Sequence, residues 1–263
     1  MPESLAQSVA EAAALQRTGR FVAFFERRTL PPASTKEDAP AEFLTMGVRC
    51  KSAKAYEQAA SWFRLAADAG NQIAQYHLAG LYKNGQGVTQ DVAQAAYWYA
   101  KAAEQGHARA QCNLGLLHKQ GRGVSKDHAQ AAVWFRAAVE QGHGPSQYHL
   151  GDLYREGLGV PQDFSLAATW FRLAAEQGHV PAQYRLGVLY REGLGVMQDF
   201  VQAAILLRQA AEQGCNLAQH SLGNLYKHGL GVPQDAEEAC VWFCKALEHG
   251  YVDFSPDPEH RED

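Results

Sequence analysis

Basic side chains recur in this sequence every 36 residues, and an aromatic side chain stands seven residues before most of them. The basic residues are Lys83, Lys119, Arg155, Arg191 and Lys227. The residues seven positions earlier are Tyr76, Cys112, Tyr148, Tyr184 and His220. Lysine and arginine steer and pair with carboxylates, while flat rings supply apolar contact area at a small entropic cost. The pattern therefore suits an extended peptide that is acidic or ends in a carboxylate.

A purely structural role for the same cations stays open. A cation in the last turn of a helix favours the helix dipole and can bond the free carbonyls, which is worth about 0.3–1 kcal/mol each. In addition, Glu156 and Glu192 directly follow Arg155 and Arg191, and they would partly cancel the field of these arginines.

The residue patterns of common catalytic sites are missing from the sequence. Penicillin-binding enzymes need a lysine three residues after the nucleophilic serine, whereas Ser52 and Lys54 are only two residues apart. No G-x-S-x-G elbow, H-E-x-x-H zinc helix or G-K-S/T phosphate loop is present. We therefore expect no enzymatic activity and no cofactor.

Cysteine and histidine offer only weak candidates for a metal site. Cys240 and Cys244 lie four residues apart and His249 follows, but Cys240 replaces an alanine of a packed stripe, so we expect a buried and inert thiol. The alanines of that stripe are Ala96, Ala132, Ala168 and Ala204. Three further histidines recur in a "QGH" turn, too far apart to share one ion with bonds of about 2 Å. We expect His107, His143 and His179 to be turn residues, and no metal to be bound.

The elements that position these residues follow from an internal repeat. "YREGLGVPQD" at 154–163 returns as "YREGLGVMQD" at 190–199. A pair of glycines, a valine and an aspartate recur with the same step in five units, without an insertion. The glycine pairs begin at Gly85, Gly121, Gly157, Gly193 and Gly229, and the aspartates are Asp91, Asp127, Asp163, Asp199 and Asp235.

Each unit is predicted to contain two helices. Apolar residues of the first helix, such as Ala74, Leu78 and Leu81, are spaced by three and four residues, and a glycine ends it. The aspartate caps the second helix, and four of the five starts match a capping box, with Gln94, Gln130, Gln202 or Glu238 three residues later and Leu166 as the exception. The second helices also carry a basic row, which we expect on a solvated outer face: Arg64, Arg136, Arg172 and Arg208.

The pattern AQYxLGxLYxxGxGVxQDxxxAAxWFxxAAEQGH resembles the Sel-1-like repeat family, relatives of tetratricopeptide repeats. The match covers residues 74–250, and residues 39–70 fit a leading hairpin whose loop is about four residues shorter. The resemblance implies an all-α fold, a right-handed superhelical α-solenoid of about six antiparallel helix pairs. Such repeats bury their apolar faces only against neighbours.

The resemblance also implies that the first helices of the repeats line a concave groove. By comparison with tetratricopeptide units, the recurring cations and rings fall on groove-lining positions, and the leading hairpin adds one more cation. The expected partner-binding residues are Lys51, Lys83, Lys119, Arg155, Arg191, Lys227, Tyr76, Tyr148 and Tyr184.

Both ends of the sequence differ from the array. We assign residues 1–38 to an N-terminal helix and a Pro-rich linker, residues 39–250 to the solenoid (leading hairpin 39–70, five repeats 71–250), and residues 251–263 to a polar tail. Whether residues 1–38 cap the first hairpin or dock a partner stays open. The N-terminus does not read as a secretory signal, and five scattered cysteines do not form a disulfide framework, so a cytoplasmic location is expected.

Composition narrows the function. The net charge of −4 and the pI near 6.3 argue against nucleic acid as a partner, and no apolar run reaches the about 18 residues of a membrane helix. We therefore predict a non-catalytic scaffold or adaptor that binds a protein or peptide in its groove. Because some cysteine-rich relatives are described as β-lactam-binding, the alternative is a secreted or periplasmic hydrolase similar to penicillin-binding proteins and β-lactamases.

Overall fold

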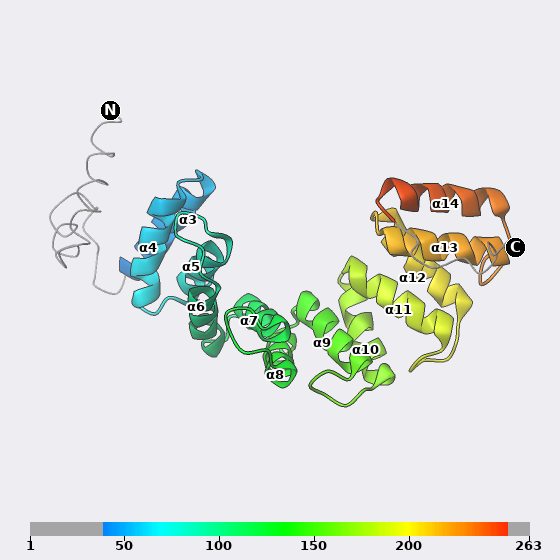
Figure 1. Cartoon of the computed structure of the whole chain (residues 1–263), viewed down its shortest axis with the longest axis horizontal. Coiled ribbons are helices and arrows are strands. Elements are labelled where there is room, and N and C mark those ends of the chain that lie inside the picture. The colour runs from blue at the N-terminus through cyan, green and yellow to red at the C-terminus, as the bar shows by residue number, and fades with distance from the viewer. Residues whose placement is uncertain (1–38, 252–263) are drawn as a thin grey trace, which may run out of the picture. The chain divides into compact units, whose positions relative to one another are not determined.

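The computed structural model describes residues 39–251, which hold twelve α-helices and no strand (Figure 1). None of these helices is both long and apolar enough for a membrane span. The predicted segment 1–38 and all of the predicted tail except Tyr251 lie outside the described residues. The helices are α3 (Ala39–Ser52), α4 (Tyr56–Asp68), α5 (Gln72–Asn84), α6 (Val92–Glu104), α7 (Ala108–Gln120), α8 (His128–Val139), α9 (Gly144–Glu156), α10 (Phe164–Glu176), α11 (Val180–Glu192), α12 (Phe200–Glu212), α13 (Asn216–His228) and α14 (Ala236–Glu248).

The described residues form two compact units, each of which we describe by itself. One unit holds residues 39–117 and 121–125, and the other holds residues 118–120 and 126–251. Helices α3 to α6 pack in chain order within the first unit, and helices α8 to α14 do so within the second. The prediction of an all-α fold made of six helical hairpins is thereby confirmed. The loop of the leading hairpin is residues 53–55, whereas the next hairpin uses residues 85–91.

The repeated phrase "YREGLGVPQD" forms a loop that satisfies the polar groups at both helix ends. Gly157 ends α9 with a φ of +68°, in the left-handed conformation that glycine tolerates. The Gln162 side chain donates to the carbonyl of Arg155 at 2.9 Å, and the backbone N–H of Asp163 donates to the carbonyl of Tyr154 at 2.9 Å. These bonds occupy carbonyls that the end of a helix leaves without partners.

The second helices of the five repeats start with a capping aspartate, but only one of the two hydrogen bonds of the predicted capping box forms, so that prediction is wrong in its second bond. In all five repeats the aspartate accepts a backbone N–H from the third helical residue, Gln94, Gln130, Leu166, Gln202 or Glu238. A capping box also needs the reverse bond, from that residue's side chain to the N–H of the aspartate. In each repeat this N–H instead donates to a carbonyl of the preceding first helix, as Asp163 does to Tyr154. The identity of the third residue therefore matters little, which explains why Leu166 is tolerated.

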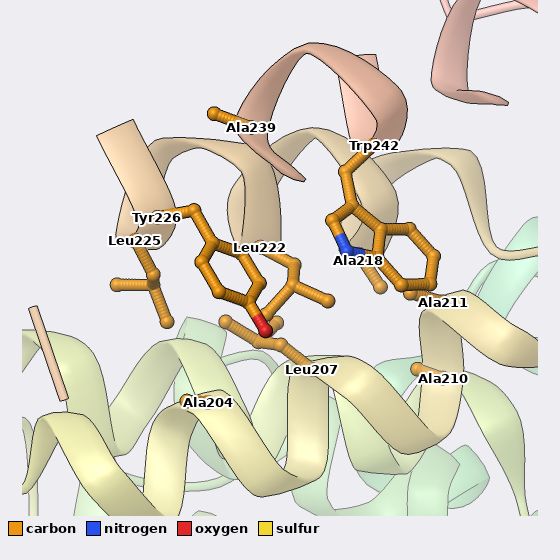
Figure 2. Close-up of a cluster of buried hydrophobic side chains, with 10 residues drawn as sticks. All are labelled: Ala204, Leu207, Ala210, Ala211, Ala218, Leu222, Leu225, Tyr226, Ala239 and Trp242. Carbon is orange, nitrogen blue, oxygen red and sulfur yellow. The ribbon is translucent and has the colours of Figure 1, made fainter. Parts of the chain in front are cut away.

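The core lies where the small side chains of one second helix meet the following first helix. Figure 2 shows such a cluster, in which alanines of α12 face leucines of α13 and the ring of Trp242 on α14. Small side chains allow helices to approach closely, and the larger ones fill the space between turns. The buried members are Ala204, Leu207, Ala210, Ala211, Ala218, Leu222, Leu225, Tyr226, Ala239 and Trp242.

In four of the five repeats a buried glutamine links the first helix to the second helix before it. Gln75 donates from Nε2 to the carbonyl of Ala67 at 3.1 Å and accepts at Oε1 from Gln105 at 2.8 Å. Gln183 is placed in the same way, with a 3.5 Å contact to the Ala175 carbonyl and a 3.0 Å bond from Gln213. The recurring "AQ" and "EQG" thus satisfy buried polar groups across the boundary between repeats.

Two arginines of the basic row of the second helices, Arg136 and Arg172, are exposed, and Arg64 and Arg208 are half-buried. The row also makes contacts that the sequence does not predict. Each arginine donates from Nη2 to the hydroxyl of a tyrosine 18 residues later, at 2.8 Å for Arg136 and Tyr154 and at 3.0 Å for Arg172 and Tyr190. The same bond joins the outer two pairs, Arg64 with Tyr82 and Arg208 with Tyr226. Because each arginine lies in one repeat and its tyrosine in the next, these pairs join neighbouring hairpins.

The last helix corrects a second prediction, because Cys240 is exposed rather than buried. Ala204, which occupies the same register as Cys240 in the preceding repeat, is only 4% exposed. A second pair shows the same difference, since Ala211 of α12 is 1% exposed and Leu247, at the same register of α14, is 64% exposed. The difference arises because α13 covers the face of α12, whereas no described hairpin follows α14. Burial of this face depends on the next repeat and not on the residue type.

The second glycine of each loop is required by a close approach of two backbones. A Cβ on Gly159 would stand 2.3 Å from the backbone carbonyl carbon of His128 at the start of α8, and the φ of Gly159 is +70°. Gly178 has a comparable φ of +79°, but nothing lies within 4 Å of a Cβ built there.

We therefore predict that Gly159→Ala destabilises the protein far more than Gly178→Ala. The control variant should lose only the cost of a left-handed alanine, about 1–2 kcal/mol, and Gly159→Ala at least about twice that. Urea unfolding followed by circular dichroism measures both. Equal losses would show that the loop does not pack on the preceding helix as described.

Candidate functional site

The predicted partner-binding cations lie at the ends of the first helices. At four of these positions the backbone carbonyl accepts from the glutamine side chain of the following loop, at 2.8–3.0 Å. The backbone of this register is therefore part of a helix terminus, and any binding role must come from the side chains. The four are Lys83, Arg155, Arg191 and Lys227.

The side chains at this register have different surroundings. Lys51 Nζ lies 3.3 Å from Nδ1 of His77, and Arg191 pairs with Glu192 at 2.8 Å. Lys83 and Lys227 make no ion pair with any residue that the structure describes. The recurring cations are thus not equivalent, although the sequence repeats them in register.

Three cations from three successive first helices gather around the carboxylate of Asp152. Lys119 of α7 donates to Oδ2 at 3.2 Å, and Arg155 of α9 donates to Oδ1 from Nε at 3.2 Å and from Nη2 at 3.0 Å. Nε of Arg185 on α11 lies 3.9 Å from Oδ1. Arg155 also pairs with Glu156. We call Lys119, Asp152, Arg155 and Arg185 the Asp152 cluster.

The surroundings of Asp152 keep it ionised. The residue is 7% exposed, and burial alone would raise the pKa of its carboxyl. Lys119 and the hydrogen bonds from Arg155 outweigh burial, and they hold this pKa below its usual value. The cluster therefore contains a charged carboxylate whose partners come from its own helix and from the two neighbouring first helices.

Two histidines of the first helices are held neutral. Burial and the nearby charge of Lys119 lower the pKa of His149 to about 4, and burial and Lys51 lower the pKa of His77 to about 4. Their rings stack on Phe135 and Phe63, with centroids 5.3 and 5.0 Å apart. Both imidazoles are uncharged at neutral pH.

The predicted rings are half-buried and already engaged with neighbouring repeats. Tyr76 stacks on His107 with centroids 4.6 Å apart, and Tyr148 lies 4.9 Å from His179. Tyr184 is partly buried and packs against the core cluster that contains Leu207 and Leu222. Tyr148 also lies close enough to Arg185 to help raise the pKa of that guanidinium against the opposing effect of burial. These rings support the repeat boundary, and they offer a ligand only part of their surface.

The histidines of the "QGH" turn are the residues that precede first helices. His107 caps α7, since its Nδ1 accepts the backbone N–H of Ala110 at 3.1 Å. His143 and His179 occupy the same position before α9 and α11. Within residues 39–251, no three histidine, cysteine or acidic side chains come together as a metal ion would require.

Recurrence in the sequence does not indicate Asp152 or Arg185. The register of Asp152 holds Gly80, Leu116, Val188 and Asn224 in the other repeats. The register of Arg185 holds His77, Asn113, His149 and Ser221. A signal was present, because these first-helix positions vary while their neighbours recur, and variation is where a repeat protein can place a site that is unique along the array.

The fold and the recurring register define a helical-repeat protein. The model of the Sel1 repeat matches residues 51–71, 72–107, 108–143, 144–179, 180–215 and 216–251. The chain therefore belongs to the Sel1 repeat family, whose members generally serve as protein–protein interaction scaffolds without catalytic activity.

Two solved structures are similar to this chain over most of its length. One is a protective antigen of uropathogenic Escherichia coli with an SLR fold, with 41% identity and a TM-score of 0.78 over 82% of this chain and 47% of the antigen. The chain thus spans about half of that protein. The other is a Sel1 repeat protein from Oxalobacter formigenes, with 36% identity and a TM-score of 0.74 over 80% of this chain and 86% of that protein. No curated protein matches the chain.

The lowered pKa of His149 predicts a loss of stability in mild acid. Above pH 6.5 the ring is neutral in the folded and unfolded states; between pH 6.5 and about 4 only the unfolded state binds the proton. The free energy of unfolding should fall by up to about 1.4 kcal/mol per pH unit from this one group.

The variant His149→Asn isolates this effect, because Asn113 occupies the same register in the preceding repeat. Urea unfolding of both proteins at pH 7, 6, 5 and 4.5 should show a shallower pH dependence for the variant. Identical slopes would contradict the assignment of a neutral, buried imidazole.

Proposed function

We propose that this protein is a non-catalytic scaffold that holds an acidic segment of a protein partner along the surface of its first helices. By analogy with tetratricopeptide repeats, we expect the first helices to line the groove that receives the segment. The proposal extends the general role of the family to one face and to one chemistry of partner.

One observation carries the proposal, namely that polar side chains of successive first helices contact one another. Lys51 of α3 reaches His77 of α5, and Lys119 of α7 reaches Asp152 of α9. Within each unit, neighbouring first helices therefore share a polar surface that includes cations. A segment lying across these helices would meet basic groups from more than one repeat.

The charges of this surface favour an acidic partner. Each recurring position carries a lysine or arginine, and two of them, Lys83 and Lys227, have no acidic partner among the described residues. Complementary charge increases the association rate and suppresses wrong partners more than it adds affinity. Nothing in the structure or the relatives favours the hydrolase alternative, and we do not propose it.

Selection from a displayed peptide library tests the proposal with the full chain. At low salt we expect enrichment of peptides rich in Asp and Glu. The charge reversals Lys83→Glu, Arg191→Glu and Lys227→Glu, combined in one variant, should weaken binding of the selected peptides by about tenfold or more, because repulsion replaces attraction along the surface.

A matched control reverses three exposed cations elsewhere, Lys101→Glu, Arg122→Glu and Lys126→Glu, and so changes the net charge equally. It should retain most of the binding. Selected peptides without acidic residues, or equal losses in both variants, would refute the proposed surface.

A further inference from the structure

The positive charge of the Asp152 cluster exceeds the negative charge of Asp152 and of Glu156, which pairs with Arg155. Three cations, Lys119, Arg155 and Arg185, face two carboxylates, Asp152 and Glu156. His149 adds no charge at neutral pH, since burial lowers its pKa to about 4. One positive charge is left, which matches a single monoanionic group.

Arg185 is the cation of the cluster whose N–H groups do not donate to Asp152. Its Nε lies 3.9 Å from Asp152 Oδ1, too far for a hydrogen bond, whereas Arg155 and Lys119 both donate to this carboxylate. The Arg185 side chain is 34% exposed, against 25% for Arg155 and 22% for Lys119. A guanidinium has five N–H groups in a planar fork, and such a fork fits a carboxylate with two parallel hydrogen bonds.

Arg185 has neighbours on two sides in the structure. Burial lowers the pKa of its guanidinium, but Tyr148 of the preceding first helix and the charge of Asp152, 3.9 Å from Nε, outweigh burial and raise it. The ring of Tyr184 lies beside the guanidinium, with its centroid 5.8 Å from Cζ. Preorganised donors bind with a smaller loss of side-chain entropy than mobile ones.

The same registers do not form this arrangement in the other repeats. Asp152 is the one acidic residue at its register, and Arg185 is the one arginine at its own. The recurring cation of α11, Arg191, has the carboxylate of Glu192 as its partner instead.

We propose that Arg185, positioned by Tyr148 and Asp152, is the specific binding site for one carboxylate of the bound segment, with Lys119 beside it. The inference rests on the proposed function. It makes that function more specific, because it assigns carboxylate binding to one residue, Arg185, rather than equally to all the recurring cations. The carboxylate comes from a Glu or Asp side chain or from a peptide C-terminus.

Fluorescence anisotropy with two labelled peptides tests the site in the full chain at low salt. The first probe is hexaglutamate with an amidated C-terminus, which offers only side-chain carboxylates. The second is hexaglutamine with a free C-terminus, which offers only the terminal one. A probe that binds through the site identifies which source of carboxylate it takes.

The decisive comparison is between two arginines of the same helix. Arg185→Gln should weaken binding of at least one probe by about tenfold or more, and Arg191→Gln by less than about threefold. Arg185→Lys keeps the charge but not the fork, so it should restore only part of the affinity. Thermal melts of all three variants establish that they are folded.

Three outcomes would overturn the inference, and they are distinguishable. Equal losses of affinity in Arg185→Gln and Arg191→Gln would leave the proposed binding of an acidic segment standing but would refute a specific site at Arg185. Full affinity in Arg185→Lys would show that charge alone matters and that no fork binds the carboxylate. No binding of either probe by the natural protein would remove the proposed acidic partner together with the centre.

Discussion

The structure depends on one constraint, which is that a single hairpin cannot bury the apolar face of its second helix. Ala204, Leu207 and Ala211 of α12 are buried because α13 lies over them, as Figure 2 shows. The corresponding face of α14 has no following hairpin in the described residues, and Leu247 is left 64% exposed. Each repeat therefore gains its stability from the boundary with its neighbour, which is the general property of solenoids.

Polar contacts across these boundaries then determine which side chains become neighbours. The buried glutamines and the arginine–tyrosine pairs recur at fixed registers, so within each unit they hold successive hairpins in the same relation. In that relation, residues of successive first helices meet, and Lys119 and Arg185 both reach Asp152. The candidate site is thus a product of the repeat geometry, although its own residues do not repeat.

Much of the fold could be predicted from the sequence because the same helix-ending glycine and helix-capping aspartate recur in five repeats. The glycine helix end and the capping aspartate are local and recur in register, so the sequence indicates both. The sequence does not predict the pairing of Arg172 with Tyr190, because the two residues lie in different repeats. It predicts a buried Cys240, because register alone cannot tell whether another hairpin follows. Asp152 and Arg185 escape prediction for the opposite reason, since each occurs once at its register and recurrence does not point to it.

The first helices present one carboxylate site at Arg185 in the proposal made above. A crystal structure of the full chain with amidated hexaglutamate, or with hexaglutamine ending in a free carboxylate, would show whether a ligand occupies it. A peptide carboxylate should pair with the Arg185 guanidinium at about 2.8 Å, with Lys119 and Arg155 still on Asp152. A peptide bound on the second helices, or bound with Arg185 turned away from it, would contradict the proposed site.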